Sequence, residues 1–242
     1  IRDAAGEATG VFVDRAEGLV APPERSPEEV RRALGLAMDE CLAKGVTSLT
    51  DAGADTAVIA LYREAARAGK LRTRLYVMAA GLPTMRALGR PDSGHGMLAV
   101  RAVKLYADGA LGSRGAALLE PYSDDPGNSG LLVTPPEGLL EAARFALAHG
   151  FQVGTHAIGD RANRIVLDAY EAAFRESPAA RDPRFRIEHG ADDHRALLGT
   201  AARLRGDTRR ARRAVRHVAQ RLHKGRPQQL HLPATQLGNL AQ

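Results

Sequence analysis

The chain has no tryptophan, a single cysteine, and aromatic residues at only 4% of its 242 positions. Cys41 has no partner for an internal disulfide, so we expect a buried free thiol and a reducing, cytoplasmic compartment. No apolar run approaches the roughly 18 residues of a membrane span, which argues against a membrane partner. The 44% hydrophobic content is that of one globular domain or most of one.

Acidic residues are nearly absent from the C-terminal part of the chain. Residues 195–242 hold ten Arg and one Lys against one acid, Asp207, which gives +10; the whole chain carries +6, so residues 1–194 carry −4. Such a basic block is typical of tails that neutralise phosphates. It has no aromatic residue for base stacking, so we expect a solvated, disordered extension over residues 191–242 and no nucleic-acid partner.

Helix and strand patterns alternate from residue 26 onward. Ser26-Pro27-Glu28-Glu29 predicts a capped helix start and Gly45 a stop. The remaining segments are strands at 46–50, 74–80, 102–107, 152–156 and 184–189, and helices at 56–68, 136–149 and 161–174. This order predicts an α/β fold with a parallel sheet covered by helices, and its five strands are too few to close an eight-stranded barrel.

Two further parts flank or interrupt these repeats. Residues 1–25 contain Gly6 and Gly10 and predict a loop or hairpin leading into the barrel domain of residues 26–190. Residues 120–134 are rich in turn formers and predict a long loop over the edge where the strands end.

Three potential metal ligands, Lys104, His156 and His189, stand at or near the C-terminal ends of successive strands. In strand-helix repeats these ends converge on one site. Alternation places Lys104 opposite Val103 and Leu105, so it faces inward if those two pack against helices. A buried ammonium then needs a carboxylate partner, a lowered pKa or a covalent change such as carboxylation.

Each of the three residues also has a purely structural reading. Lys104 fits an ion-paired structural lysine, and either histidine alone fits a hydrogen-bonded core residue. Their joint placement predicts a metal centre, although such a centre normally needs more ligands.

The segment after Lys104, DGALGSRG, supplies two candidate substrate-binding residues, Asp108 and Arg114. Its glycines allow close approach of a ligand to the backbone, and Arg114 is suited to an anionic group. A structural turn is the alternative reading. Asp160 fits the N-cap of the helix that is expected to start at Arg161.

Together the segments VKLYADGALGSRGAAL, THAIGDRAN and RIEHG resemble the metal-dependent amidohydrolase superfamily, most closely its YtcJ-like branch, amidohydrolase family 3. This branch includes enzymes similar to N-substituted formamide deformylases. The resemblance covers about residues 1–190. It implies a TIM-type barrel joined to a small β-sandwich, and one or two divalent metal ions, usually zinc. With only five predicted strands, this chain would hold an incomplete TIM-type barrel. The implied reaction is hydrolysis of a C–N bond in a small amide-like substrate other than a peptide.

By position in these motifs, the resemblance implies that Lys104 is the carboxylated lysine that bridges the metals. His156 and His189 correspond to the two later histidine ligands. It further implies attack of an activated water on a polarised carbonyl, with a carboxylate carrying the proton to the departing amine.

The chain departs from the family pattern at both ends. No histidine precedes His95 to supply the first-strand His-x-His, and no strand ending in the metal-binding aspartate follows His189. We therefore expect a fragment with weak metal binding and little or no turnover. A change of reading frame would explain its basic tail. Its exposed strand edges favour association between copies. A non-catalytic polyanion-binding protein on a degraded barrel and a metal-dependent lactonase or phosphotriesterase remain open as alternatives.

Overall fold

The computed structural model describes residues 1–12, 14–21, 23–180 and 182–190. A 3-10 helix, η1, spans Asp14–Leu19, and five α-helices and six strands follow. The helices are α1 (Pro27–Ala43), α2 (Thr56–Arg67), α3 (Gly81–Leu88), α4 (Pro136–His149) and α5 (Asp160–Glu176). The strands are β1 (Ser48–Ala54), β2 (Arg74–Ala80), β3 (Asp92–His95), β4 (Leu98–Tyr106), β5 (Gln152–Ala157) and β6 (Arg186–His189).

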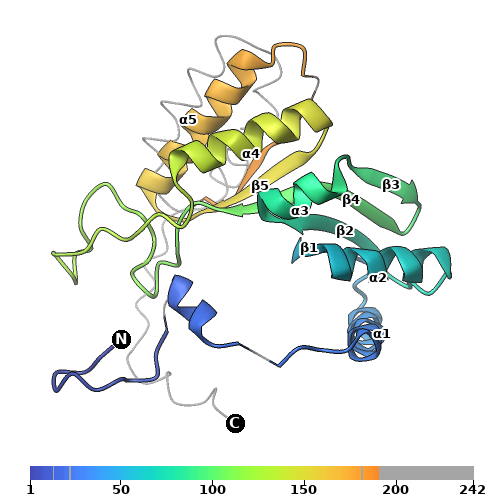
Figure 1. Cartoon of the computed structure of the whole chain (residues 1–242), viewed down its shortest axis with the longest axis horizontal. Coiled ribbons are helices and arrows are strands. Elements are labelled where there is room, and N and C mark those ends of the chain that lie inside the picture. The colour runs from blue at the N-terminus through green and yellow to red at the C-terminus, as the bar shows by residue number, and fades with distance from the viewer. Residues whose placement is uncertain (13, 22, 181, 191–242) are drawn as a thin grey trace.

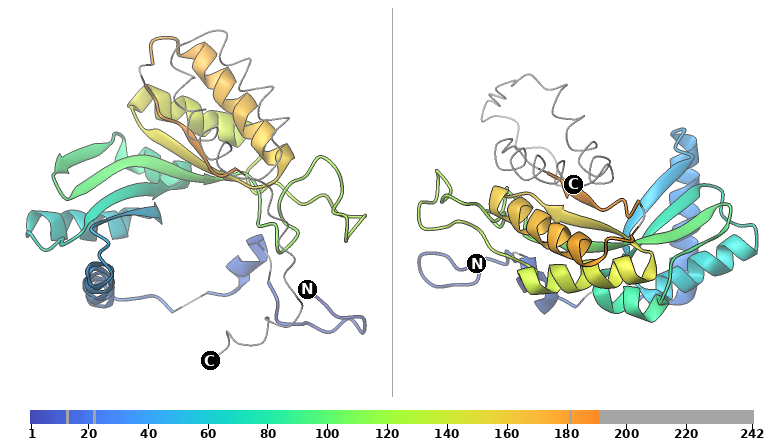
Figure 2. Two further views of the ribbon diagram at one scale, coloured as in Figure 1. Left: turned by 180° about the vertical axis from the view of Figure 1, so that it is seen from behind. Right: turned by 90° about the horizontal axis from the view of Figure 1, so that it is seen from above.

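The six strands form one sheet in the order β1-β2-β4-β5-β6, with β3 attached to β4. Neighbours along the main path are parallel, and only β3 runs antiparallel to its partner. The sheet curls into an open half barrel, with α2 to α5 along its outer face (Figure 1; Figure 2). The predicted incomplete (β/α) barrel is thereby confirmed.

The hydrophobic core lies between the sheet and these helices. Val103, Leu105 and Val153 belong to it, as strand alternation predicts, and Lys104 lies on the opposite, inner face. From the helices come Ile59, Met85, Leu139 and Val166 among others. Burying an aliphatic side chain of this size contributes about 1.5–3 kcal/mol, so this layer holds the strands in register.

The helix starts show why these residues form these elements. The Oγ of Ser26 accepts from the backbone N–H of Glu29 at 3.2 Å, and Glu29 Oε2 accepts from the N–H of Ser26 at 2.7 Å. This reciprocal pair confirms the predicted capping box. Asp55 caps α2 in the same way, through the N–H of Val58 at 2.8 Å.

Two elements were missed from the sequence. Gly81 and Pro83 are residue types typical of turns, but they lie in the first turn of α3, where proline is tolerated because no intrahelical N–H donor is needed there. The short hairpin strand β3 carries too few apolar residues to show alternation.

One local prediction is wrong. Asp160 is the first residue of α5 rather than its N-cap; Gly159 takes the cap position and offers no side chain. Asp160 Oδ1 instead accepts from the N–H groups of Leu119 and Arg161.

The other predicted segments keep their irregular character. Residues 1–12 fold back through an isolated antiparallel bridge between Arg2 and Ala8. Residues 107–135 form the long connection from β4 to α4. None of the helices in the described ranges combines the length and apolar character of a membrane span. The basic segment 191–242 and the predictions about it lie outside the described residues.

Candidate active site

The structure brings the predicted trio together on the inner face of the half barrel. Lys104 pairs in register with Gly154, and Tyr106 of β4 pairs with His156 of β5. The Lys104 Nζ lies 3.8 Å from the centroid of the Tyr106 ring. That ring lies 5.5 Å from the imidazole of His156, and the centroids of the His156 and His189 rings are 4.8 Å apart. The four side chains form a continuous row at the strand ends.

His189 reaches this row through an unusual backbone conformation. It pairs in register with Ala157, whose side chain belongs to the core beneath the helices. Simple alternation would therefore place His189 on the helix side of the sheet. Its φ of 77° lies in the left-handed region, which costs energy for a residue with a side chain. Such strain, of order 1–3 kcal/mol, is found mainly where function requires it.

Lys104 is a buried lysine, with 6% of its surface exposed. Burial lowers the pKa of Lys104, and the negative charge of Glu188 opposes that shift. Glu188 Oε1 in turn accepts from Arg186 Nε at 2.5 Å. Arg186 and Glu188 thus form an ion pair on the inner face, and each side chain is 31% exposed.

Gly154 makes room for this charged group. A Cβ at that position would lie 2.8 Å from Glu188 Oε1 and 2.4 Å from the methyl carbon of Met78. The space that the glycine leaves beside His156 is thus filled by Met78 and Glu188. Glu188 and Tyr106 were not singled out as site residues, although same-face alternation in β4 and β6 is the signal that would have found them.

His156 is held by its Nε2 atom, which lies 3.3 Å from the carbonyl oxygen of Gly109. A carbonyl only accepts hydrogen bonds, so this contact favours a proton on Nε2, which leaves the lone pair of Nδ1 for a metal. Burial lowers the pKa of His156, and this outweighs the opposing effects of the Gly109 carbonyl and the Asp108 charge. The lowered pKa of His156 favours the neutral imidazole, which is the form that binds metals.

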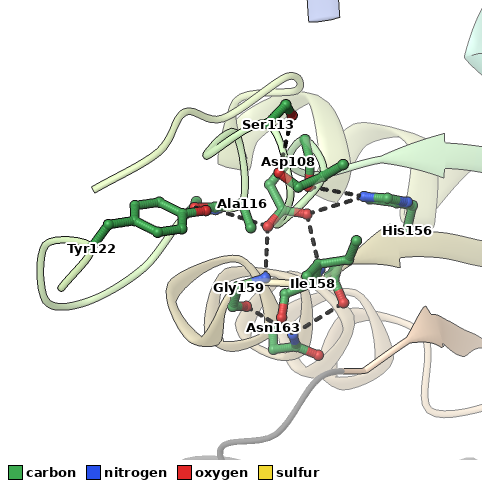
Figure 3. A network of polar contacts seen from close by, with 12 residues as sticks. Asp108, Ser113, Ala116, Tyr122, His156, Ile158, Gly159 and Asn163 are labelled. Carbon is green, nitrogen blue, oxygen red and sulfur yellow. Dashed lines mark hydrogen bonds and ion pairs between the residues drawn. The ribbon is translucent and has the colours of Figure 1, made fainter. Parts of the chain in front are cut away.

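The two predicted substrate-binding residues have protein partners. The carboxylate of Asp108, 1% exposed, accepts from the backbone N–H groups of Ala117, Ile158 and Gly159 (Figure 3). Arg114 is exposed and pairs with both carboxylate oxygens of Asp124, at 3.3 and 3.0 Å. Substrate binding by either residue stays a prediction.

The site fits a divalent metal in part. His156 and His189 supply two adjacent imidazoles, the nitrogen ligands that zinc prefers. Within the described ranges, no three His, Cys, Asp or Glu side chains are grouped to hold a metal ion. Lys104 would have to become anionic to complete even a three-ligand set.

Comparison with known proteins places the chain in context. The sequence profile of the amidohydrolase family matches residues 1–237, which extends beyond the limit near residue 190 that the motifs set. The chain is 36% identical over 206 residues to Protein LONG AFTER FAR-RED 3 of Arabidopsis thaliana, covering 78% of this chain and 35% of that protein. It is 34% identical over 213 residues to the putative amidohydrolase YtcJ of Bacillus subtilis, covering 84% and 39%.

A solved structure agrees with these relatives. An uncharacterized metal-dependent hydrolase from Pyrococcus furiosus superposes with a TM-score of 0.65 at 27% identity, covering 78% of this chain and 39% of that one. The chain therefore spans between 35% and 39% of the length of these three proteins.

Proposed function

Because this chain belongs to the amidohydrolase family, we propose that it is part of a metal-dependent hydrolase that cleaves C–N bonds in amide-like substrates other than peptides. The observation that carries the proposal is the pairing of the His156 and His189 imidazoles beside the inward-facing Lys104. A relative of known chemistry supports the substrate class: N-substituted formamide deformylase of Arthrobacter pascens is 29% identical over 203 residues, covering 78% of this chain and 37% of that enzyme.

We infer that zinc is the metal, because two imidazoles and an oxygen anion form a typical zinc-binding set. His156 would contribute Nδ1, and His189 its ring. A divalent metal bound there would promote ionisation of water and polarise the substrate carbonyl.

Lys104 would supply the oxygen anion after carboxylation. Its neutral amine adds to carbon dioxide, forming a C–N bond and releasing one proton, so the product is a carbamate. The lowered pKa of Lys104 favours the neutral amine that this addition requires. The carboxylate of Glu188 favours the ammonium form instead, so only part of the Lys104 population would be the neutral amine that reacts.

The chain is further proposed to be an incomplete copy with weak metal binding and little turnover. A catalytic zinc usually takes three protein ligands and keeps an open position. The described residues supply only the two imidazoles without covalent change. The carboxylate that would carry a proton to the departing amine has no candidate in the trio.

A zinc-binding and hydrolysis experiment tests the proposal. The purified chain would be loaded with zinc, dialysed and analysed for bound metal, then assayed on an N-substituted formamide and a matched ester. We expect weak zinc binding that His156→Asn abolishes and that His149→Asn leaves unchanged, because His149 stacks on Phe145 in α4, outside the trio.

Each other outcome would speak against a particular part of the proposal. Equal zinc binding by wild type and His156→Asn would overturn the metal site. Faster cleavage of the ester than of the formamide would support a lactonase. Salt-sensitive binding to a nucleic acid, without any zinc binding, would support a polyanion-binding protein.

A further inference from the structure

Asp108 is a buried carboxylate that accepts hydrogen bonds from backbone amides rather than from a basic side chain. Its Oδ2 accepts from the N–H of Ala117 at 2.9 Å and of Gly159 at 2.8 Å, and its Oδ1 accepts from the N–H of Ile158 at 3.0 Å. Of the described ionisable groups, only His156 is paired with it, at 3.5 Å from Nε2 to Oδ1. Hydrogen bonds to a charged acceptor are worth more than neutral ones, so this cluster is a strong local constraint.

These amides belong to two different connections. Ala117 lies in the segment that follows β4, whereas Ile158 and Gly159 form the turn from β5 into α5. Asp108 thus places its negative charge at the N-terminus of α5, where the helix dipole favours an anion. The Asp108 carboxylate thus compensates for the N-cap residue Gly159, which has no side chain to cap α5.

The two connections pack backbone against backbone. A Cβ at Gly159 would lie 1.9 Å from the carbonyl oxygen of Ala117, so no side chain separates them. The N–H of Ala162 also donates to that same oxygen, at 3.3 Å. Any shift of the segment after β4 must therefore move the turn after β5, and with it the end of the strand that carries His156.

The same cluster faces the imidazole of His156. Its Nε2 is directed at the Gly109 carbonyl and at Asp108 Oδ1, at 3.3 and 3.5 Å (Figure 3). Both oxygens are acceptors, so together they favour a proton on Nε2. The adjacent carboxylate makes this preference stronger than a single carbonyl would.

We propose that Asp108 is a positioning residue that locks His156 in the Nε2–H tautomer and so presents Nδ1 toward His189 and Lys104. The use made of Nδ1 rests on the proposed function, whereas the tautomer is a property of the metal-free chain. In this role Asp108 acts through His156 and through the turn at Ile158 and Gly159.

Asparagine at position 108 disturbs the amide cluster in either orientation of its side chain, and it removes the acceptor that faces His156 in one of them. With the NH2 group in the place of Oδ2, a donor faces the N–H groups of Ala117 and Gly159. With the NH2 group in the place of Oδ1, a donor faces both Ile158 N–H and the imidazole Nε2, which would then have to accept. The matched control is Asp160→Asn, which also removes one negative charge beside the N-terminus of α5. Its single acceptor oxygen, which binds Leu119 and Arg161, is retained.

The test is NMR on the metal-free full chain labelled with nitrogen-15. Long-range nitrogen–proton correlations identify the tautomer of His156, and amide hydrogen exchange reports the three clamped N–H groups. In the wild type we expect the Nε2–H tautomer and protected amides at Ala117, Ile158 and Gly159. In Asp108→Asn we expect exchange at Ile158 or Gly159 that is faster by about tenfold or more. Faster exchange at Ile158 marks the orientation with the NH2 group in the place of Oδ1, and it should come with a mixed or Nδ1–H tautomer of His156. Asp160→Asn should match the wild type at His156.

The wild-type spectrum alone can overturn the proposal, even if Asp108→Asn does not fold: an Nδ1–H tautomer of His156 would contradict it. So would an Asp108→Asn protein in which exchange at Ile158 is faster but the tautomer is unchanged, because the NH2 group would then face Nε2 without effect. An equal change in Asp160→Asn would also contradict it, since the effect would then be one of general loosening. None of these readouts needs metal, so a failure of the zinc assay leaves the result interpretable.

Discussion

The imidazoles of His156 and His189 meet edge to face, with their ring centroids 4.8 Å apart. The two residues are not register partners, because His156 pairs with Glu188 and His189 pairs with Ala157. The left-handed backbone of His189 makes this meeting possible. Geometry of this kind links local strain in β6 to the formation of the candidate metal site.

Replacing His189 separates the backbone requirement from the metal requirement. Asparagine adopts positive φ readily, so the free energy of unfolding of His189→Asn in urea should lie within about 0.5 kcal/mol of the wild-type value. His189→Val should lose about 1–2 kcal/mol of this free energy through backbone strain. Both variants should lose zinc binding in calorimetric titrations. Equal stability of the two variants would contradict the strain argument.

Carboxylation of Lys104 predicts that carbon dioxide strengthens metal binding. Adding bicarbonate to the wild type should increase zinc affinity, because the carbamate is an anionic oxygen ligand and the ammonium is not. Lys104→Arg should show no bicarbonate effect, since its guanidinium stays protonated. A bicarbonate response that persists in Lys104→Arg would rule out Lys104 as the reacting group.

The backbone contact at Gly159 predicts a large difference between two glycine substitutions. Gly159→Ala places a methyl group 1.9 Å from Ala117 O and should destabilise the fold by about 3 kcal/mol or more. Gly112 lies in the connection after β4 that also holds Ala117, and a Cβ there would meet nothing within 4 Å. Gly112→Ala should therefore change stability by less than about 1 kcal/mol. Urea denaturation would measure both; similar values would mean that the connections can move apart.

The buried hydroxyl pair of Thr155 and Tyr170 predicts non-additive losses. The two oxygens lie 2.7 Å apart, and Tyr170 also donates to Arg186 O at 3.2 Å. Tyr170→Phe should cost about 1–2 kcal/mol, because the Thr155 hydroxyl loses its partner and Arg186 O loses a donor. Thr155→Val should cost less, because the Tyr170 hydroxyl still donates to Arg186 O. The double variant should lose less than the sum of the single losses. Strict additivity in a double-mutant cycle would show that the pair contributes nothing.

The inner-face pair of Arg186 and Glu188 should matter more than a comparable surface pair. Glu188→Gln leaves Arg186 without its carboxylate partner, and Lys104 without its nearby negative charge, in a partly buried setting. A loss of about 1–3 kcal/mol is expected. Glu176→Gln breaks an exposed pair with Arg144 and should have little effect on the urea midpoint. A larger stability loss in Glu176→Gln than in Glu188→Gln would show that the inner-face pair is as accessible to solvent as the surface pair.

Much of the fold was predictable because it depends on local patterns. The capping box at Ser26 and the strand at Arg74–Ala80 follow from residue order alone. The helix Gly81–Leu88 was missed because proline and glycine mark both turns and first helical turns. The cap of α5 was misassigned to Asp160 because its actual anion, Asp108, lies far upstream in the sequence.

The candidate site was predictable in its members but not in its contacts. Strand ends gave Lys104, His156 and His189, since parallel strands bring their C-terminal ends to one edge. The pairing of Glu188 with Arg186 and the filling of the space at Gly154 depend on neighbouring strands, which a single sequence does not place.

The sequence by itself determined the alternation of elements, the inward face of Lys104 and the family motifs, because periodicity and local hydrogen bonding act over a few residues. Only the tertiary structure decided that His189 turns toward His156, that Glu188 lies near Lys104 and that Asp108 joins two connections. Those relationships depend on strand register and on backbone packing between distant segments, and both are set by the whole core rather than by any one stretch of it.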